Sequence, residues 1–225
     1  YFYAKIVRNM TPLERVYFVT GIDTDAGKSY VTGMLARDWR ARGCRVITQK
    51  FIQTGCTGAS EDIGLHRKIM GTGLLPEDLD FTTAPLRFTY PASPDLAVRI
   101  DGRKLDLSLV EKSTQRLLER YDTVLIEGAG GLMVPLEGLY TTLDYIAERR
   151  LPVILVTNPK LGSINHTLLS LEMCRVRGVK VGFVAYNLCP ETSPEITDDT
   201  REVIRTYLAK TMPECVFLEF PFCRL

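Results

Sequence analysis

The fold of this chain is decided by the stretch VYFVTGIDTDAGKS, residues 16–29. It begins with an apolar run that favours a β-strand, continues in a loop with Gly at both ends, and finishes with Lys-Ser at the start of a helical pattern. Closely spaced backbone N–H groups and the positive end of a helix suit a polyphosphate, so the stretch predicts a phosphate-binding loop. In such a loop Lys28 would reach the terminal phosphates and the Ser29 hydroxyl would bind Mg²⁺.

The loop departs from the usual Gly-x4-Gly-Lys-Ser/Thr spacing. Ile22 stands where the first glycine is expected, and Gly21 comes one residue too early. A Gly-Lys-Ser that occurs by chance in an ordinary turn is therefore the alternative. The strand predicted before the loop and the helix predicted after it favour the phosphate site.

The composition indicates a globular chain without a strong overall charge. Its 225 residues are enough for one substantial core, and we expect residues 1–225 to form a single ATP-binding α/β domain. With 28 Lys and Arg against 27 Asp and Glu, no general field attracts nucleic acid or an anionic membrane. No apolar stretch approaches the roughly 18 residues that span a bilayer. We therefore predict a cytoplasmic protein that binds neither nucleic acid nor membrane.

The cysteines, the histidines and the N-terminal residues suggest no metal cluster, disulfide framework or signal peptide. The six cysteines contain no C-x-x-C pair and mostly lie within or beside apolar segments, so we interpret them as reduced thiols. His66 and His166 are far apart, and we interpret each as structural. Residues 1–15 are broken by charges and a proline, unlike a signal peptide. We interpret them as an N-terminal extension, with Met10 as a candidate original start.

Strand-favouring runs alternate with helical patterns along the chain. We expect strands at 16–20, 45–50, 123–127, 153–158, 180–187 and 215–220, and helices at 28–42, 63–70, 105–121, 141–150, from 160–166 to about 177, and 194–210. This alternation predicts an α/β fold, a mostly parallel sheet with helices on both faces as in P-loop NTPases. Residues 71–101 contain four prolines that exclude a continuous helix. Such long irregular segments are often functional, and a surface excursion without consequence is the alternative.

Two predicted strands end in side chains suited to a ligand. Lys50 ends one strand and Thr54 follows it, which brings a cation and a hydroxyl to the edge where open α/β sheets bind ligands. Glu127 ends another strand, at the point where P-loop nucleotidases use an acid to help hold Mg²⁺. The glycines that follow let a backbone approach a ligand closely. The alternative is an ordinary strand-to-loop turn.

Several separated segments together resemble one family, the dethiobiotin synthetases. The resemblance rests on TGIDTDAGKS (20–29), KFIQTG (50–55), EGAGGLMVPL (127–136) and LGSINH (161–166), and it covers roughly residues 16–222 in the right order. The family's loop also carries the extra residue between its glycines, so the departure at Ile22 becomes a point in favour. The combination of EGAGG with the LGxINH turn is specific, whereas Gly-Lys-Ser alone is not.

The resemblance implies an ATP-dependent reaction of biotin biosynthesis. The enzyme would carboxylate 7,8-diaminononanoate with CO₂ and close the ring, which gives dethiobiotin, ADP and phosphate. The family reaction passes through a carbamate and a carbamic-phosphoric anhydride. ATP is implied as co-substrate, Mg²⁺ as cofactor, and a homodimer with composite active sites as the assembly.

The resemblance also implies roles for individual residues. The catalytic groups that would contact the γ-phosphate and the carbamate are Lys50, Lys28 and Thr24. The implied Mg²⁺ ligands are Ser29, Asp62 and Glu127. The implied ATP-binding residues are Asp25, Ala26, Gly27, Lys28, Ser29, Tyr30, Glu127, Gly128, Gly130, Asn187, Pro221 and Phe222. The implied substrate-binding residues are Thr54, Gly131, Leu161, Gly162, Ser163, Ile164 and Asn165, and the turn 161–165 would come from the other subunit.

The sequence departs from the family pattern near the expected ligands. Phe51 stands where the family usually has Pro, and Asp95 replaces the His of a common Ser-Pro-His; both concern the substrate channel. For Asn187, a buried structural role is the alternative to reading the adenine. The chain ends at Leu225, soon after the segment expected to line the base, from which we expect weaker selectivity for ATP over CTP and GTP.

Three other functions compete with this interpretation. A regulatory or partitioning ATPase of the P-loop class commonly has a lysine five residues before the loop lysine, where this chain has Asp23, and the chain shows no basic excess or amphipathic membrane tail. An ATP-dependent amidating enzyme of cobalamin synthesis usually needs a fused glutaminase domain. The third alternative is a nucleotide-binding protein that has lost its activity.

Overall fold

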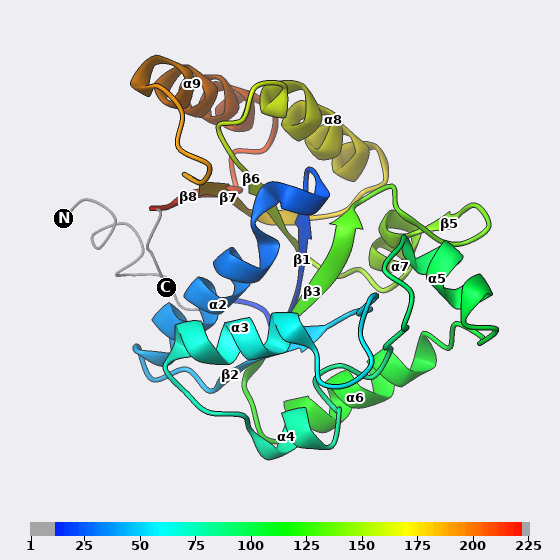
Figure 1. Ribbon diagram of the computed structural model, residues 1–225. Helices are drawn as coiled ribbons and strands as arrows, with labels where there is room; N and C mark the ends of the chain where they lie inside the picture. Colours follow the sequence, from blue (N-terminus) through cyan, green and yellow to red (C-terminus); the bar gives the residue numbers. More distant parts are fainter. Residues whose placement is uncertain (1–11, 222–225) are drawn as a thin grey trace.

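The computed structural model describes residues 12–221, and its centre is a six-stranded sheet (Figure 1). The strands are β1 (Val16–Gly21), β2 (Val46–Lys50), β3 (Thr123–Gly131), β6 (Val153–Thr157), β7 (Val181–Asn187) and β8 (Val216–Phe220). Their order across the sheet is β2-β3-β1-β6-β7-β8, and every neighbouring pair is parallel. The predicted α/β fold is confirmed. Most of the interpreted N-terminal extension, residues 1–11, lies outside the described residues, as does Phe222.

Helices link the strands. They are the 3₁₀ turn η2 (Thr24–Ala26), α2 (Lys28–Arg40), α3 (Glu61–Met70), α4 (Pro76–Leu79), α5 (Pro94–Ile100), α6 (Ser108–Leu118), α7 (Thr142–Glu148), α8 (Ser163–Val176) and α9 (Pro194–Thr211). Local signals explain the limits of α3. Ser60 accepts a hydrogen bond from the N–H of Ile63 at its start, and Gly71 ends it in the left-handed conformation with φ 67°.

Two apolar clusters cover opposite faces of the sheet. In β1, Tyr17 and Val19 belong to a cluster formed largely with α2, whereas Phe18 belongs to a cluster that includes residues of α6, α7, α8 and α9. Successive strand residues point to opposite faces, so this division follows the pleat of the strand. Both faces are therefore covered by helices, which explains why apolar residues predominate in most strands of the sheet.

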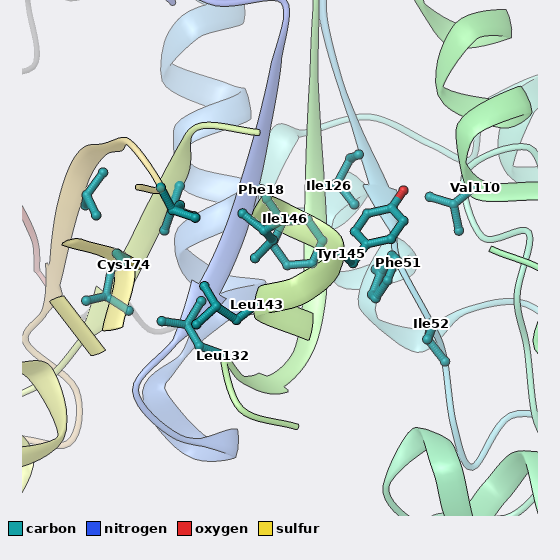
Figure 2. Close-up of a cluster of buried hydrophobic side chains, with 14 of the residues drawn as sticks. Phe18, Phe51, Ile52, Val110, Ile126, Leu132, Leu143, Tyr145, Ile146 and Cys174 are labelled. Carbon is teal, nitrogen blue, oxygen red and sulfur yellow. The ribbon is translucent and has the colours of Figure 1, made fainter. Parts of the chain in front are cut away.

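Phe51 packs in the core directly after β2 (Figure 2). Its ring centroid lies 5.2 Å from that of Phe18 and 4.7 Å from that of Tyr145. The side chain is completely buried. The departure from the family's usual proline is thus accommodated by aromatic packing between β1 and α7.

The irregular segment 71–101 runs beside the chain that leaves β2. The N–H of Lys50 donates to Thr83 O, the N–H of Gln53 to Leu86 O, and the N–H of Phe88 to Gln53 O. The segment contains the short helices α4 and α5, which the proline pattern allowed but did not predict. The sequence also gave no indication of the two-stranded hairpin β4 (Pro135–Glu137) and β5 (Tyr140–Thr141).

The pairing of β1, β2 and β3 determines where the polar side chains meet. Lys50 in β2 is the direct partner of Glu127 in β3, and Val19 in β1 is the partner of Glu127 on the other side. The loop after β1 therefore lies at the same edge as Lys50. Among residues 12–221, none of the helices has the length and apolar character to span a membrane.

Candidate active site

A cavity of about 770 Å³ opens at this edge of the sheet. It brings together many of the predicted site residues, namely Thr24, Asp25, Gly27, Lys28, Ser29, Tyr30, Lys50, Thr54, Asp62, Glu127 and Gly130. Residues 91–94 also line it, so part of the segment 71–101 borders the candidate site. Phe51 and Asp95 are not among its lining residues; the Asp95 carboxylate accepts hydrogen bonds from Arg99 Nε and the N–H of Gly138.

A close contact with Asn187 holds the end of the predicted phosphate-binding loop. Gly27 precedes α2 with φ 89°, a conformation that favours glycine. A Cβ added there would lie 2.2 Å from Asn187 Nδ2. The same amide donates to Ala26 O at 3.1 Å. In this structure Asn187 therefore supports the loop from the end of β7, and it does not line the cavity.

The Lys28 ammonium lies against its own loop. Nζ donates to Asp23 O at 2.9 Å and to Thr24 O at 3.1 Å. Burial lowers the pKa of Lys28 to about 8, although the carboxylate of Glu127 acts in the opposite direction. An anion placed in the cavity would favour the charged form of this lysine.

Lys50 forms the centre of a buried charge cluster. Its Nζ lies 2.7 Å from Glu127 Oε1 and 2.5 Å from Asp62 Oδ2. The Ser29 hydroxyl lies 2.9 Å from Asp62 Oδ1 and 2.8 Å from Glu127 Oε1. Four side chains from β2, β3, α2 and α3 thus meet at one end of the cavity, so the structure places Lys50 beside the three residues that the resemblance implies as Mg²⁺ ligands.

The charges of this cluster stabilise one another. Burial alone would raise the pKa of Glu127, but Lys50 and His66 outweigh it and hold that pKa well below its ordinary value. Burial alone would lower the pKa of Lys50, but Glu127 and Asp62 outweigh it and raise it. Both groups therefore stay ionised across the physiological range.

The oxygens of Ser29, Asp62 and Glu127 fit a Mg²⁺ ion that also binds phosphate. Hydroxyl and carboxylate oxygens are hard ligands, and Mg²⁺ usually takes one or two carboxylates together with water and substrate phosphates. Within residues 12–221 no group of three or more His, Cys, Asp or Glu side chains is arranged to hold a metal. The three oxygens therefore suit a Mg²⁺ ion whose other ligands are phosphate and water.

His66 belongs to this cluster, which the sequence analysis did not foresee. Its side chain is completely buried, and Nε2 lies 2.6 Å from Glu127 Oε2. Asp62 and His66 are four residues apart on α3 and so share one face of the helix. That spacing, next to a predicted metal ligand, is the signal that could have identified it.

The remaining predicted residues lie outside the main cavity. Leu161, Gly162 and Asn165, at the start of α8, are exposed, while Ser163 is buried beside a small separate pocket and Ile164 is half-buried. Gly131 borders a different groove of about 480 Å³, together with residues of α8. The C-terminal segment reaches α2 where Tyr30 donates its hydroxyl to Pro221 O at 2.6 Å.

A phenylalanine ring packs on Gly128, which also lies outside the cavity lining. A Cβ added to Gly128 would lie 2.7 Å from Phe18 Cε1. This position needs glycine because β1 approaches closely.

Comparisons with known proteins point to one family. The family model described as "AAA domain" matches residues 15–215. The protein named ATP-dependent dethiobiotin synthetase BioD 2 of Pasteurella multocida is 49% identical over 91% of this chain and 96% of its own length. The protein of the same name in Haemophilus influenzae is 55% identical over 79% of this chain and 93% of its own length. The ATP-dependent dethiobiotin synthetase BioD of Chlorobaculum tepidum is 49% identical over 87% of this chain and 82% of its own length.

Solved structures share the fold. A nucleotide-binding protein from Archaeoglobus fulgidus, in complex with ADP, aligns with a TM-score of 0.50 over 97% of this chain and 86% of its own. The signal recognition particle receptor FtsY of Elizabethkingia anophelis also aligns with a TM-score of 0.50, over 97% of this chain and 63% of its own. The identities are 16% and 12%, so these likenesses concern the fold alone.

Proposed function

This chain belongs to the family of ATP-dependent dethiobiotin synthetases, and from that premise we propose that it uses ATP to join CO₂ to 7,8-diaminononanoate, giving dethiobiotin, ADP and phosphate. The observation that carries the proposal is the meeting of Lys50, Asp62 and Glu127 in the cavity that the Lys28 loop also lines. A site for moving a phosphoryl group between two anions needs fixed positive charge beside the phosphate loop.

The proposed chemistry has three steps. One substrate amine adds to CO₂ and loses a proton, which forms a carbamate. A carbamate oxygen then attacks the γ-phosphorus of ATP, and the bond to the ADP oxygen breaks. The second amine attacks the carbonyl carbon of the resulting carbamic-phosphoric anhydride, the bond to the phosphate oxygen breaks, and a proton is lost as the cyclic urea closes.

Lys28 and Lys50 would act by electrostatics. Both ammonium groups border the cavity, Lys50 from the end of β2 and Lys28 from the loop after β1, with β3 between these two strands. Both lie at buried positions where charge is weakly screened. Lys28 would turn from the loop carbonyls to the γ-phosphate, and Lys50 would stabilise the carbamate and the transferred group. Thr24, which also lines the cavity, would contact the same oxygens. The substrate supplies the nucleophiles, so the protein needs no nucleophile of its own.

Ser29, Asp62 and Glu127 would hold the Mg²⁺ that accompanies ATP. The ion would neutralise charge on the β- and γ-phosphates. In the structure Lys50 lies on the two carboxylates, so part of their negative charge is already balanced. Nucleotide binding would redistribute these contacts.

The substrate site would be shared by two subunits. Thr54 borders the main cavity, while the turn 161–165 opens α8 elsewhere on the same chain. Its backbone N–H groups and the Asn165 amide suit a carboxylate, such as that of the diamine. The exposed apolar side chains of Met133, Leu161 and Leu169 lie near this region and support a homodimer. A single ATP-binding domain and a cytoplasmic location stay part of this proposal.

The direct test is product formation. The protein is incubated with ATP, Mg²⁺, bicarbonate and 7,8-diaminononanoate, and dethiobiotin is detected by mass. We expect dethiobiotin and an ADP release that depends on the diamine. ATP hydrolysis that the diamine does not change, without dethiobiotin, would contradict the proposal and favour a nucleotide switch.

Lys50→Ala separates transition-state stabilisation from binding. We expect turnover to fall by about 100-fold or more, while ADP binding changes by less than about threefold, because Lys50 would act mainly on the transferred group. Initial rates and calorimetric titration with ADP measure the two effects. Lys68→Ala is the control: it removes a lysine from an exposed position of α3, outside the cavity lining. If ADP binding collapsed with turnover, Lys50 would instead be a ground-state anchor.

A further inference from the structure

A buried chain of hydrogen bonds leads from Arg67 to Glu127 through His66. Arg67 Nη1 lies 2.9 Å from Thr48 Oγ1, which lies 3.0 Å from His66 Nδ1. His66 Nε2 lies 2.6 Å from Glu127 Oε2. All four side chains are at most 2% exposed. Arg67, Thr48 and His66 are not among the residues that line the cavity, so direct contact with a ligand does not explain their hydrogen bonds.

The hydrogen bonds that link Arg67, Thr48, His66 and Glu127 all run in one direction, from donor to acceptor. Arg67 can only donate, so Thr48 Oγ1 accepts its hydrogen bond and has its own proton free for His66 Nδ1. The Glu127 carboxylate can only accept, so the ring proton of a neutral His66 lies on Nε2, which donates to Glu127. Nδ1 is then an acceptor, and the Thr48 hydroxyl donates to it. Arg67 is itself held by two hydrogen bonds of 2.8 Å to the carboxylate of Asp78. The direction is therefore anchored at both ends.

The two oxygens of Glu127 have different partners. Oε2 accepts from His66 on the inner side, whereas Oε1 faces Ser29 and Lys50 in the cavity. A glutamate has one more side-chain torsion than an aspartate, and the strand fixes only its backbone. The contact with His66 selects the orientation that presents Oε1 to the cavity.

Helix α3 also delivers Asp62 to the same cluster. Asp62 and His66 lie one turn apart, and the helix begins at Ser60, whose hydroxyl donates to Gln53 Oε1 at 2.6 Å. Asp62 reaches Lys50 from this helix, and His66 reaches Glu127. One helix thus sets the positions of both carboxylates.

We propose that His66 is a positioning residue that orients Glu127 for the metal of the bound nucleotide. The inference rests on the proposed function, which assigns Glu127 to Mg²⁺. Hydrogen-bond partners of ligating side chains typically change metal affinity by about 10- to 100-fold when they are removed. His66 would act through Glu127 and would touch neither nucleotide nor substrate.

Two amide substitutions test the contact. In His66→Gln the amide reaches the place of Nε2 and can still donate to Glu127, whereas in His66→Asn it reaches only the place of Nδ1. Mn²⁺ binding to the protein with ADP is measured by electron paramagnetic resonance. We expect His66→Asn to weaken Mn²⁺ binding by about tenfold or more and His66→Gln by less than about threefold. His66→Leu, which removes both contacts, replaces the asparagine variant if that variant does not fold.

Gln49→Leu is the matched control for lost stability. Gln49, in β2, is buried as His66 is. Its side chain contacts Thr114 and Val110 O of α6, on the face of the sheet opposite α3. We expect this variant to lower the melting temperature and leave Mn²⁺ affinity unchanged. Equal Mn²⁺ affinity in His66→Asn, His66→Gln and the wild type would overturn the proposal, as would an equal loss in Gln49→Leu.

The measurement separates this inference from the proposed function. The Mn²⁺ titration needs only ADP, and it does not require that dethiobiotin forms. If the wild type made no dethiobiotin but His66→Asn still weakened Mn²⁺ binding, the reaction assignment would fail and the positioning role would stand. If dethiobiotin formed and the affinities did not differ, the positioning role alone would fail.

Discussion

At the scale of single residues, the charged groups of the candidate site differ in how strongly their ionised forms are stabilised. Lys50 and Glu127 lie 2.7 Å apart at completely or almost completely buried positions, and each shifts the pKa of the other toward the ionised form. Lys28 differs, because burial lowers its pKa to about 8 and its hydrogen bonds go to uncharged carbonyls. The phosphate-loop lysine is therefore the group most sensitive to an arriving anion.

This difference predicts how nucleotide affinity depends on pH. A phosphate favours charged Lys28, so below its pKa of about 8 the protein binds ADP without taking up a proton at this residue. Above that pH the free lysine is increasingly neutral, and ADP affinity should fall by up to about tenfold per pH unit. Calorimetric titration with ADP between about pH 7 and 9.5 measures the slope.

Lys28→Arg is the control for this slope. A guanidinium stays charged throughout the range, so the variant should bind ADP with an affinity that hardly changes with pH, whatever its absolute value. A wild type and a variant with the same slope would show that another group titrates.

At the scale of elements, the phosphate loop depends on a close approach between two segments that are far apart in the sequence. Gly27 needs glycine for its positive φ and also because Asn187, at the end of β7, packs against its Cα. Gly43, which follows α2, has almost the same φ of 86° but no atom within 4 Å of an added Cβ. A side chain at Gly43 would therefore meet backbone strain alone, whereas a side chain at Gly27 would meet both backbone strain and a steric clash.

We predict that Gly27→Ala destabilises the protein more than Gly43→Ala. The Gly43 variant should cost about 1–2 kcal/mol, the usual penalty for a left-handed alanine. The Gly27 variant must also displace Asn187, which breaks its hydrogen bond to Ala26 O and should weaken ADP binding. Urea unfolding and ADP titration measure the two effects. Equal costs in the two variants would show that the loop relaxes around the added methyl group.

At the scale of the whole molecule, the predicted substrate residues are divided between two places. Thr54 borders the main cavity, but Asn165 is exposed at the start of α8 and outside that lining. A composite site in a homodimer would explain this separation, since a twofold interface can bring the turn of one subunit to the cavity of the other.

Mixing two inactive variants tests the composite site. Lys50→Ala damages the cavity and Asn165→Ala damages the turn, so a heterodimer of the two would contain one intact site. In a random mixture half of the dimers are of this kind, and activity should recover to roughly a quarter of the wild type. Initial rates after co-expression of the two variants measure the recovery.

The control is a mixture of Lys50→Ala with Lys28→Ala. These residues border the same cavity of one chain, so no heterodimer has an intact site and no activity should return. Recovery in both mixtures, or in neither, would argue against a shared site.

The amino-acid sequence alone determined the order of strands and helices along the chain, the phosphate loop and the identities of the charged groups around it. Periodicity and glycine placement act locally, and they fix which residues form β1, α2 or the strand that ends at Glu127. The hairpin β4-β5 escaped prediction because its strands are too short to carry a period. The two short helices of residues 71–101 escaped it for the same reason.

Only the tertiary structure decided which side chains meet. Glu127 is 77 positions from Lys50 and 61 from His66 in the sequence, and no local pattern links them. The register of β2 against β3 brings Lys50 beside Glu127, and the packing of α3 brings His66 to the other carboxylate oxygen. Phe51 likewise could not be placed in the core from its neighbours, because its partners come from β1 and α7. Local sequence sets backbone conformation, whereas contacts between distant side chains depend on how the elements pack.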